Sequence, residues 1–415
     1  MTDRLYYHDS FLHDFDAQVL EVGPAGSSRH AVVLDRTAFY PSSGGQAHDT
    51  GWIVPIAHAA DSPQPESKLR VSEVVETEDG RIVHYIEAEK APAKGTRVHG
   101  AIDPARRRDH MQQHSGQHVL SAAFLRLFHI PTVSFHMGAE YSSIDLDAPM
   151  LTQAQMMEAE KLGNEVIWEN RPVDIRFASA EQARELGLRK VPPVDKGKLR
   201  LIDIQDFDLT ACGGTHVEST GQIGSILLRK LEKVKQGWRV EFVCGERAMV
   251  VARRDYSVLT EAAGLFSTQI GELPRQIRKS LEEARTLRKS REALLEEVAE
   301  LEAKQMLAQT AEVNGRKIVV RLFTDRDVVF VKRLAQKLTR VESNVVALLG
   351  STFGQASLVY AQSPGQPFDM AALMRQVLSQ HGGRGGGSKD LAQGGLPQGQ
   401  ALEPALVELK AKLSA

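Results

Sequence analysis

The stretch DPARRRDHMQQHSGQHVLSAAFLRLF, residues 103–128, decides how the rest of the chain is organised. Aspartate is a favoured N-cap and proline fits the first helical position, so the opening Asp-Pro pair predicts the start of a helix. The helix carries three histidines spaced four apart, His110, His114 and His118. Residues four apart share one face, with Cβ atoms about 5–6 Å apart, whereas eight residues rise about 12 Å. One metal ion can therefore be held by the first two histidines or by the last two, but not by the outer pair.

A second stretch, LTACGGTHVEST at residues 209–220, holds Cys212 and His216, again four residues apart. Two glycines lie between them, which predicts a tight turn rather than a helix interior. Cysteine and histidine are the ligands that zinc prefers, commonly in tetrahedral sets. Each half alone has a plainer interpretation, namely a hydrogen-bonded helical histidine, or a buried cysteine beside a surface histidine. Together the two halves predict one Zn²⁺ ion per chain.

The sequence around these stretches predicts a mixed α/β (α+β) fold that has four sections. Residues 1–100 are rich in strands and turns and predict a small β-barrel, with a hairpin at 69–88 around an Asp-Gly turn. The segment at 55–68 predicts a loop insertion. Residues 101–255 predict a mixed α/β domain that contains the metal helix. Its other predicted elements are a strand at 142–148, a helix at 151–170 and the strands PVDIRFA, KLRLIDI and WRVEFVC.

Residues 256–312 predict a helical arm with many charged side chains. Apolar positions between 272 and 310 alternate spacings of three and four, as in a coiled-coil seam of about three to four heptads. The seam positions are Ala284, Leu287, Arg291, Leu294, Val298 and Leu301. Arg291 interrupts the seam, and an equally weighted alternative is a solvated arm that packs on its own chain.

Residues 313–415 predict a second α/β domain with the element order β-α-β-β-α. KIVVRLF, NVVALLG and ASLVYAQS are its predicted strands, and 325–341 and 368–380 are its predicted helices. The section then runs into the glycine-rich stretch HGGRGGGSKDLAQGG at 381–395. The plain interpretation of that stretch is a flexible linker.

Length and composition set outer limits. With 415 residues the chain is too long for one compact core, so two or three domains are expected. The formal net charge of −2 gives no global sign of a nucleic-acid partner, so any such surface must be local. We find no signal-peptide pattern at the polar N-terminus and no apolar run of the roughly 18 residues that a membrane helix needs. Two cysteines fit a reducing, cytoplasmic setting, and Cys244 in EFVCGER is interpreted as a buried structural cysteine.

Together, HSGQH at 114–118 and CGGTH at 212–216 resemble the editing domain of alanyl-tRNA synthetases and of the free-standing, AlaX-type alanyl-tRNA editing proteins. The helix around HSGQH is similar to the family's helix, in which the downstream histidine pair binds zinc. This resemblance leaves His110 out of the site. The zinc ligands that it implies are His114, His118, Cys212 and His216.

Two glycine-rich motifs extend the resemblance along the chain. RTAFYPSSGGQAHDTG at 36–51 resembles the family's glycine-rich motif, and 381–395 resembles that of the synthetase C-terminal domain, which contacts tRNA. The likeness is greatest to the long form of the free-standing editors, because the chain starts at the barrel with no room for an adenylate-forming domain. We also find no candidate ATP site, since GGRGGGSK lacks the Lys-Ser/Thr order of a P-loop.

The resemblance implies a zinc-dependent aminoacyl-tRNA deacylase that acts in trans. Its substrate would be tRNA(Ala) mischarged with serine, with glycine as a second substrate. Zinc lowers the pKa of a bound water, polarises a carbonyl or orients a substrate, and the sequence leaves these roles open. Four simultaneous ligands would close the site, so catalysis at the metal would need one ligand to yield. The alternatives are a non-catalytic tRNA-binding protein with structural zinc and an alanine–tRNA ligase-like protein, against which the missing adenylate-forming domain argues.

Most predicted substrate contacts lie in the first glycine-rich motif, and the resemblance implies that of Thr37. The Thr37 hydroxyl would face the amino-acid side chain, and a site that hydrogen-bonds a hydroxyl separates serine from alanine strongly. The backbone at Gly44, Gly45 and Gln46 would approach the substrate closely. His136 in SFHMG would be a polar group or an acid/base of the pocket. The plainer interpretations are a strand residue, an ordinary turn and an isolated histidine.

Basic residues suited to tRNA contacts form three groups. The first lies at the start of the metal helix, where cations oppose the helix dipole and so favour a functional role over a solvated helix start. It consists of Arg106, Arg107 and Arg108. The second follows the CGGTH turn and consists of Lys230, Lys233, Lys235, Trp238 and Arg239. Arg384 and Lys389 lie in the C-terminal glycine motif, and a homodimer would form through 272–310 and the C-terminal domain.

Overall fold

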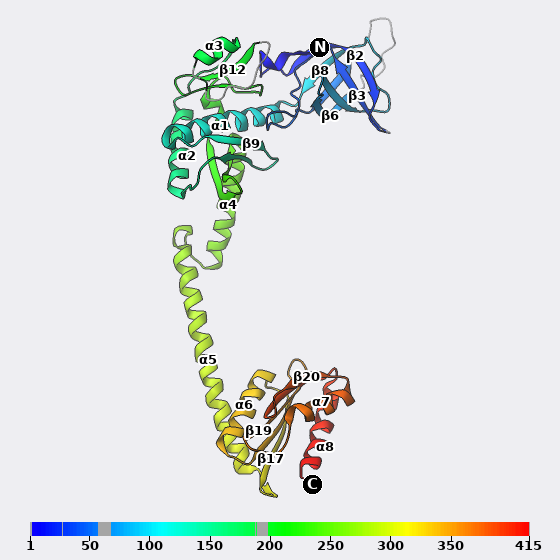
Figure 1. Ribbon diagram of the computed structural model, residues 1–415, viewed down its shortest axis with the longest axis vertical. Coiled ribbons are helices and arrows are strands. Elements are labelled where there is room, and N and C mark those ends of the chain that lie inside the picture. Colours follow the sequence, from blue (N-terminus) through cyan, green and yellow to red (C-terminus); the bar gives the residue numbers. More distant parts are fainter. Residues whose placement is uncertain (1, 27, 57–67, 187, 189–197, 415) are drawn as a thin grey trace. The chain divides into compact units, whose positions relative to one another are not determined.

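The structure is a computed structural model that describes residues 2–26, 28–56, 68–186, 188 and 198–414. It divides into two compact units, Met1–Glu261 and Ala262–Ala415, whose elements are labelled in Figure 1. All but three residues of the predicted insertion at 55–68 lie outside the described residues.

The first unit begins with a closed, six-stranded antiparallel barrel, as the sequence predicted. Around the barrel the strands are β2 (Asp14–Pro24), β3 (Arg29–Leu34), β7 (Ile82–Glu87), β6 (Leu69–Glu76), β5 (Gly51–Pro55) and β8 (Arg97–Ile102). Exposed and buried residues alternate at the start of β2, so every second side chain fills the interior. Val32, Leu34, Ile53 and Ile86 are fully buried there. The predicted hairpin at 69–88 is the pair β6 and β7.

A short parallel pair precedes the first long connection of the barrel. β1 (Asp3–Arg4) pairs with β4 (Arg36–Thr37), and the 3-10 turn η1 (Leu5–Tyr7) follows β1. Residues 38–50, between β4 and β5, carry most of the first glycine-rich motif, and we call them the glycine loop.

Helix α1 (Pro104–Phe128) follows β8 and begins where the sequence predicted. The carboxylate of Asp103 accepts hydrogen bonds from the backbone N–H groups of Ala105 and Arg106, which caps the helix. The helix ends at His129, whose φ of 58° lies in the left-handed region. Every residue from Gln113 to Phe124 is buried, so the middle of α1 is enclosed by other elements.

Two small sheets and one long helix enclose α1. The four-stranded sheet has the order β14 (Ile226–Val234), β15 (Gly237–Cys244), β10 (Ser142–Leu146) and β9 (Thr132–Met137). α2 (Gln153–Trp168) packs beside α1, as Figure 1 shows. The remaining elements are β11 (Val173–Ala178), α3 (Ala180–Glu185), β12 (Leu199–Ile204), β13 (Asp208–Ala211), η2 (Thr220–Ile223) and α4 (Gly245–Leu265). The predicted strands and the 151–170 helix are confirmed.

The second unit is a six-stranded sheet with helices on both faces. Its strand order is β16 (Glu312–Val313), β17 (Arg316–Phe323), β18 (Val345–Ser351), β19 (Ser357–Gln362), β21 (Leu391–Gly395) and β20 (Arg384–Gly387). One core joins the sheet to α6 (Val328–Val341) and the end of α5 (Leu273–Gln309), which η3 (Ile270–Glu272) precedes. A second core joins the sheet to α7 (Met370–His381) and α8 (Leu402–Ser414). The 3-10 turn η4 (Gly399–Ala401) precedes α8.

Helix α5 confirms the predicted arm but packs through a different register. The leucines of the predicted seam face solvent, with Leu287, Leu294 and Leu301 at least 60% exposed. The last turns of α5 instead bury Ala299 and Ala303 against the same unit. The alternative, an arm that packs on its own chain, therefore describes these last turns, and the coiled coil and homodimer stay predictions.

The C-terminal glycine-rich stretch is not a linker. Residues 384–395 form the hairpin β20–β21 at the edge of the sheet, with Gly385 opposite Gly394. A Cβ on Gly385 would lie 2.4 Å from the Cα of Gly394, so the strands approach too closely for a larger residue. Helix α8 was not predicted from the sequence, and it packs in the same core as α7.

We predict that a chain cut after Glu261 folds on its own, because the barrel and the core around α1 lie wholly in the first unit. Thermal unfolding followed by circular dichroism should give one transition, within about 4 °C of the first unit's transition in the full chain. A shift well beyond that would show that the second unit stabilises the first.

Candidate metal centre

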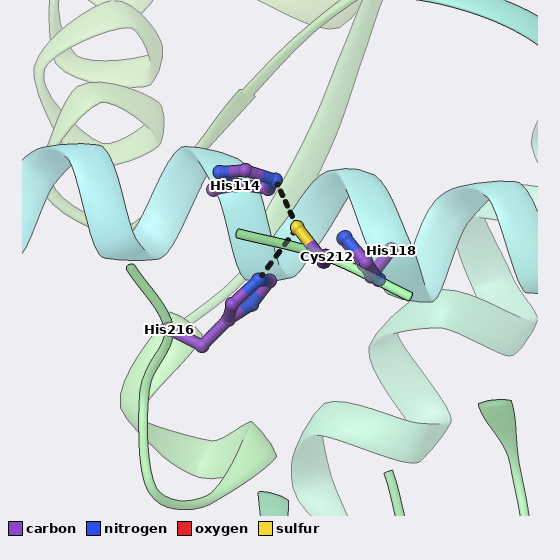
Figure 2. Close-up of side chains that lie close together, drawn as sticks. All are labelled: His114, His118, Cys212 and His216. Carbon is purple, nitrogen blue, oxygen red and sulfur yellow. Dashed lines mark hydrogen bonds between the residues drawn. The ribbon is translucent and has the colours of Figure 1, made fainter. Parts of the chain in front are cut away.

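The four predicted zinc ligands converge in the first unit (Figure 2). His114 and His118 come from successive turns of α1, and Cys212 and His216 come from the loop after β13. One ligand atom from each lies within 4.8 Å of the other three. Sγ of Cys212 is 3.3 Å from Nε2 of His114 and 3.4 Å from Nε2 of His216. Zinc bonds of about 2.0–2.3 Å in a tetrahedron separate ligand atoms by about 3.3–3.8 Å, so these residues fit a zinc ion.

The second ring nitrogen of each histidine faces a partner outside the cluster. The pairs are Nδ1 of His114 with Oε1 of Gln46 at 2.6 Å, Nδ1 of His216 with Oγ of Ser115 at 3.1 Å, and Nδ1 of His118 with Oδ2 of Asp208 at 3.5 Å. Metal-binding histidines commonly have such partners, which fix the ring and its tautomer. The Nε2 atoms of His114 and His216 are thereby turned toward the thiol of Cys212.

The charges in the cluster also suit a metal. Burial alone would raise the pKa of the Cys212 thiol, but the three neighbouring histidines hold this pKa well below its usual value. Burial lowers the pKa of the His216 imidazole well below its usual range, against the opposing effect of Cys212. A thiolate and neutral imidazoles are the forms in which these residues bind a metal ion. The three histidines are each 3% exposed, and Cys212 is the one residue of the four with intermediate exposure.

Two glycines give the ligands room. At Gly214, in the CGGTH loop, a Cβ would lie 2.1 Å from Cε1 of His114. At Gly116, on α1, a Cβ would lie 2.2 Å from Sγ of Cys244. Both distances are far below van der Waals contact, so these positions suit only glycine. Cys244 is fully buried, and burial raises the pKa of its thiol, as expected of a structural cysteine.

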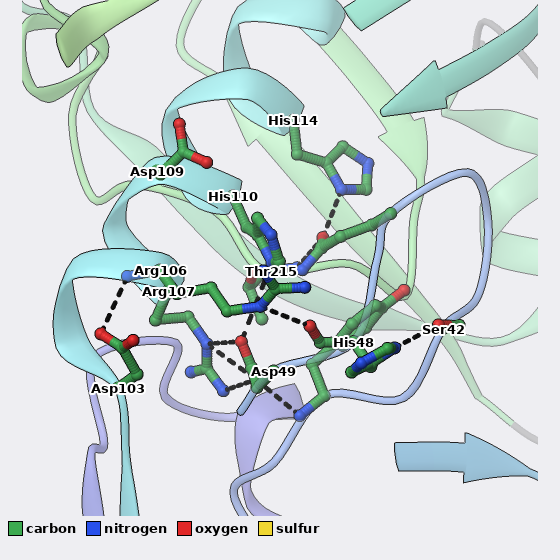
Figure 3. Close-up of polar contacts among 12 residues, drawn as sticks. Ser42, His48, Asp49, Asp103, Arg106, Arg107, Asp109, His110, His114 and Thr215 are labelled. Atoms are coloured by element: carbon green, nitrogen blue, oxygen red, sulfur yellow. Dashed lines mark hydrogen bonds and ion pairs between the residues drawn. The ribbon is translucent and has the colours of Figure 1, made fainter. Parts of the chain in front are cut away.

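His110 lies outside the cluster (Figure 3). Its Nδ1 atom is 3.9 Å from Oδ1 of Asp49 in the glycine loop. Burial, followed by the nearby Arg106 guanidinium, lowers the pKa of His110 to about 4. Spacing alone allowed either of two histidine pairs to be the metal ligands. In the structure, the pair that lies in the cluster is the one that the resemblance implied.

The glycine loop lies against the cluster. Gly44 and Gly45 have φ values of 57° and 84°, in the left-handed region that favours glycine. A Cβ on Gly45 would lie 2.4 Å from the carbonyl oxygen of Phe135 on β9, so a larger residue would push the loop away. This close approach places the side chain of Gln46 in the interior, 2% exposed and in contact with His114. The predicted contact between this backbone and a substrate stays a prediction.

Thr37 ends β4, outside the six barrel strands, and has 0% exposed surface. Nδ1 of His84 lies 3.1 Å from the carbonyl oxygen of Val32, which accepts only, so Nδ1 carries the proton. The Thr37 hydroxyl then donates to Nε2 of His84 at 2.8 Å and accepts from the N–H of Phe39 at 3.1 Å. With its proton donated to His84, this hydroxyl could meet an amino acid only as an acceptor, through its remaining lone pair.

His136 is exposed on β9. Neighbouring residues of a strand point to opposite faces, and the ring of Phe135 lies 5.4 Å from that of His114. His136 therefore points away from the cluster, and the structure does not bring it to the metal centre.

Arg107 does not lie on the surface, contrary to the predicted phosphate contact (Figure 3). Its guanidinium has 0% exposed surface and forms an ion pair with the equally buried carboxylate of Asp49. It also donates to the carbonyl oxygens of Ser10, at 2.7 Å, and Ala38. The arginine therefore ties α1 to the N-terminal segment and to both ends of the glycine loop. This structural tie accounts for one of the cations at the helix start.

The other two arginines of this group remain accessible. Arg106 is partly buried, and its Nε donates to the carbonyl oxygen of His48 at 2.9 Å. Arg108 is exposed. These two residues stay candidates for a phosphate contact.

The second basic group lies on the hairpin of β14 and β15. Lys233 and Lys235 are exposed, and Arg239 forms an ion pair with Asp145 at 2.7 Å. Trp238 is half-buried and packs against the core around α1, so its ring is not presented for base stacking. The hairpin offers positive charge without an accessible aromatic ring of its own.

Arg384 and Lys389 are both exposed, at opposite ends of the β20–β21 hairpin. Arg384 borders a cavity of about 550 Å³ that the glycine-rich strands line together with Phe353 and Gln355. This cavity belongs to the second unit.

Sequence reasoning missed two partners of the metal ligands. Ser115 stands inside the HSGQH motif, but its contact with His216 joins residues 101 positions apart. Asp208 stands before the CGGTH loop, and nothing in its spacing points to His118. A polar residue beside a metal motif is a weak signal, because the fold decides which ligand it reaches.

Comparison with known proteins identifies the family. Family models match residues 3–106 (tRNA synthetases class II (A)), 199–241 (Threonyl and Alanyl tRNA synthetase second additional domain) and 304–415 (DHHA1 domain). Alanyl-tRNA editing protein AlaX-L of Pyrococcus horikoshii is 32% identical over 401 residues, which cover 95% of this chain and 94% of that protein. The chain belongs to the AlaX-L family of alanyl-tRNA editing proteins.

Alanine–tRNA ligases match as well. That of Archaeoglobus fulgidus is 32% identical over 406 residues, which cover 96% of this chain and 42% of the ligase. That of Pyrococcus furiosus is 31% identical over 420 residues, which cover 99% of this chain and 44% of the ligase. The chain thus spans less than half the length of these ligases. Among solved structures, the C-Ala domain from Aquifex aeolicus alanyl-tRNA synthetase matches at 25% identity and a TM-score of 0.24, covering 26% of this chain and 98% of that domain.

Among the described residues, no helix combines the length and apolar character needed to span a membrane.

We predict that Arg107→Met lowers the free energy of unfolding by about 3–5 kcal/mol, because it leaves the Asp49 carboxylate buried without its partner. Urea unfolding measures the change. Arg108→Met, at the exposed neighbouring position, is the matched control and should change it by less than about 0.5 kcal/mol. Equal effects of the two substitutions would show that the buried pair does not hold the glycine loop in place.

Proposed function

We propose that the chain is a trans-editing deacylase that hydrolyses the ester between tRNA(Ala) and a wrongly attached amino acid, with zinc at the four-residue cluster. One observation carries the proposal. The cluster of His114, His118, Cys212 and His216 occurs in a chain that aligns with an alanyl-tRNA editing protein over 95% of its length. The residue types, their distances and their protonation states all suit zinc.

Bound zinc would supply Lewis acidity and a fixed point for orienting the aminoacyl end. The chain's own residues do the rest. His114, His118 and His216 line the buried side, so the aminoacyl end approaches at Cys212, the partly exposed ligand. The glycine loop borders the cluster, and Gly44 faces open space in which backbone can meet a substrate. In this proposal the buried histidines and the loop exclude bulk water from all but the open side.

The proposed tRNA surface uses exposed and partly exposed cations of both units. In the first unit these are Arg106, Arg108, Lys233 and Arg239, and in the second unit Arg384 and Lys389. Arg107 is left out because it is buried. Contacts from two units would raise the apparent affinity for one tRNA through effective concentration.

Serine is the proposed primary substrate on tRNA(Ala), with glycine second. The support is the resemblance and the Thr37 hydroxyl at the foot of the glycine loop. That hydroxyl donates to His84 and accepts from the N–H of Phe39, so it would accept the proton of the serine hydroxyl through its remaining lone pair.

The test is deacylation of tRNA(Ala) charged separately with serine, glycine and alanine. We expect rapid release of serine, slower release of glycine and little release of alanine. A zinc chelator should abolish the release, and added zinc should restore it. Binding of tRNA(Ala) without release of any of the three amino acids would favour the alternative, a tRNA-binding protein with structural zinc.

The ligand assignment is tested by metal content. Purified wild-type protein should contain about one zinc per chain, and Cys212→Ala should lose it, because a four-ligand site depends on each ligand. His110→Ala is the matched control on the same helix and should keep the metal. Mass spectrometry of the native protein, or elemental analysis, measures the zinc. Retention in Cys212→Ala with loss in His110→Ala would overturn the assignment.

A further inference from the structure

The side chain of Gln46 makes all three of its hydrogen bonds to the two segments that carry the metal ligands. Its Oε1 atom lies 2.6 Å from Nδ1 of His114 and accepts the backbone N–H of Thr215 at 3.1 Å. Its Nε2 atom donates to the hydroxyl of Thr215 at 2.8 Å. Figure 3 shows His114 and Thr215 beside the glycine loop. Gln46 comes from the barrel, so a residue of the barrel bridges the two halves of the metal centre.

The contact with His114 decides which nitrogen of that ring binds metal. The side-chain oxygen of glutamine is an acceptor only, so the 2.6 Å contact requires a proton on Nδ1 of His114. The neutral ring then carries its lone pair on Nε2, the atom that faces Cys212 at 3.3 Å. Without Gln46 the ring would be free to carry its proton on either nitrogen.

The contacts with Thr215 fix the other half of the centre. Thr215 is fully buried and stands directly before the ligand His216. Its neighbour Gly214 leaves only enough room for the His114 ring, because a Cβ there would lie 2.1 Å from Cε1 and 3.0 Å from Oε1 of Gln46. Gln46 therefore packs directly against both the His114 ring and the CGGTH loop.

We propose that Gln46 is a positioning residue of the metal centre, which holds His114 with Nε2 toward the ion and ties the CGGTH loop to the glycine loop. The inference rests on the proposed zinc site. A consequence follows for the glycine loop. If Gln46 favours the metal-binding arrangement, bound metal must favour the docked position of Gln46 to the same extent. Metal binding would then hold the loop that carries the predicted substrate backbone, Gly44 and Gly45.

The chain offers a matched control for this proposal. Gln113, on α1 beside His114, is also a buried glutamine with three hydrogen bonds. Its bonds go to both backbone groups of Cys244, at 2.9 and 3.0 Å, and to the carboxylate of Asp109 at 3.1 Å. Substitution of either glutamine by methionine keeps the side-chain length and removes three hydrogen bonds. Only Gln46 contacts a proposed ligand.

Zinc affinity, measured in the full chain by competition with a chromophoric chelator, is the primary test. Gln46→Met should weaken zinc binding about 10- to 100-fold, the range for loss of a partner of a metal ligand. Gln113→Met should leave the affinity unchanged. Gln46→Glu should keep wild-type or tighter affinity, because a carboxylate still accepts the proton of His114. Equal zinc affinity in Gln46→Met and the wild type, or an equal loss in Gln46→Met and Gln46→Glu, would overturn the proposal.

Two further measurements complete the test of this proposal. If Gln46→Met does not fold, Gln46→Asn keeps the amide but is one methylene too short to reach His114, and unchanged affinity in that variant overturns the proposal. Hydrogen exchange of residues 38–50 should slow on addition of zinc in the wild type and in Gln113→Met, but not in Gln46→Met. No zinc binding by the wild type would instead refute the proposed zinc site, so the two failures are distinct.

Discussion

The contact between the Cys212 thiol and the imidazoles of His114 and His216 is the constraint on which the first unit depends. It joins α1 to a loop 98 residues further along the chain. Such a contact forms only if the helix presents the HSGQH face inward and the CGGTH loop turns tightly enough to meet it. Gly214 makes the turn, and Gly116 lets β15 approach the same helix. The two glycines thus belong to the metal centre as much as its ligands do, although neither would touch the ion.

The barrel is held to this centre along one face of α1. Arg107, His110 and His114 stand three or four residues apart, and each has a partner in the glycine loop. Asp49 pairs with Arg107 and lies 3.9 Å from Nδ1 of His110, and Gln46 contacts His114. A buried ion pair has little value as a source of stability, because desolvation offsets much of the attraction. The direction of its hydrogen bonds matters more, because a guanidinium with fixed acceptors sets the position of the loop relative to the helix.

Features set by neighbouring residues could be predicted from the sequence, and features set by the fold could not. The start of α1 follows from an N-cap and a proline, and the hairpin at 69–88 follows from an Asp-Gly turn. Spacing gave the ligand pairs, but the choice between His110 and His118 needed the resemblance. The sequence does not distinguish Arg106, Arg107 and Arg108 from one another. The fold buries Arg107 and leaves the other two accessible. In the same way, α5 offered several apolar stripes, and the packed one includes Ala299 and Ala303 rather than the larger leucines.

The surroundings of the four ligands bear on how a closed site can act on a substrate. Each histidine is buried, and its second nitrogen faces a side chain that restrains the ring: Gln46, Ser115 or Asp208. Cys212 differs, because the residue is partly exposed and its sulfur accepts the N–H of Gly214 at 3.4 Å, within its own turn. If hydrolysis requires one ligand to make way for water or for an ester oxygen, the arrangement favours Cys212, because the printed contacts of its sulfur within the described residues go to two other ligands and to the N–H of Gly214.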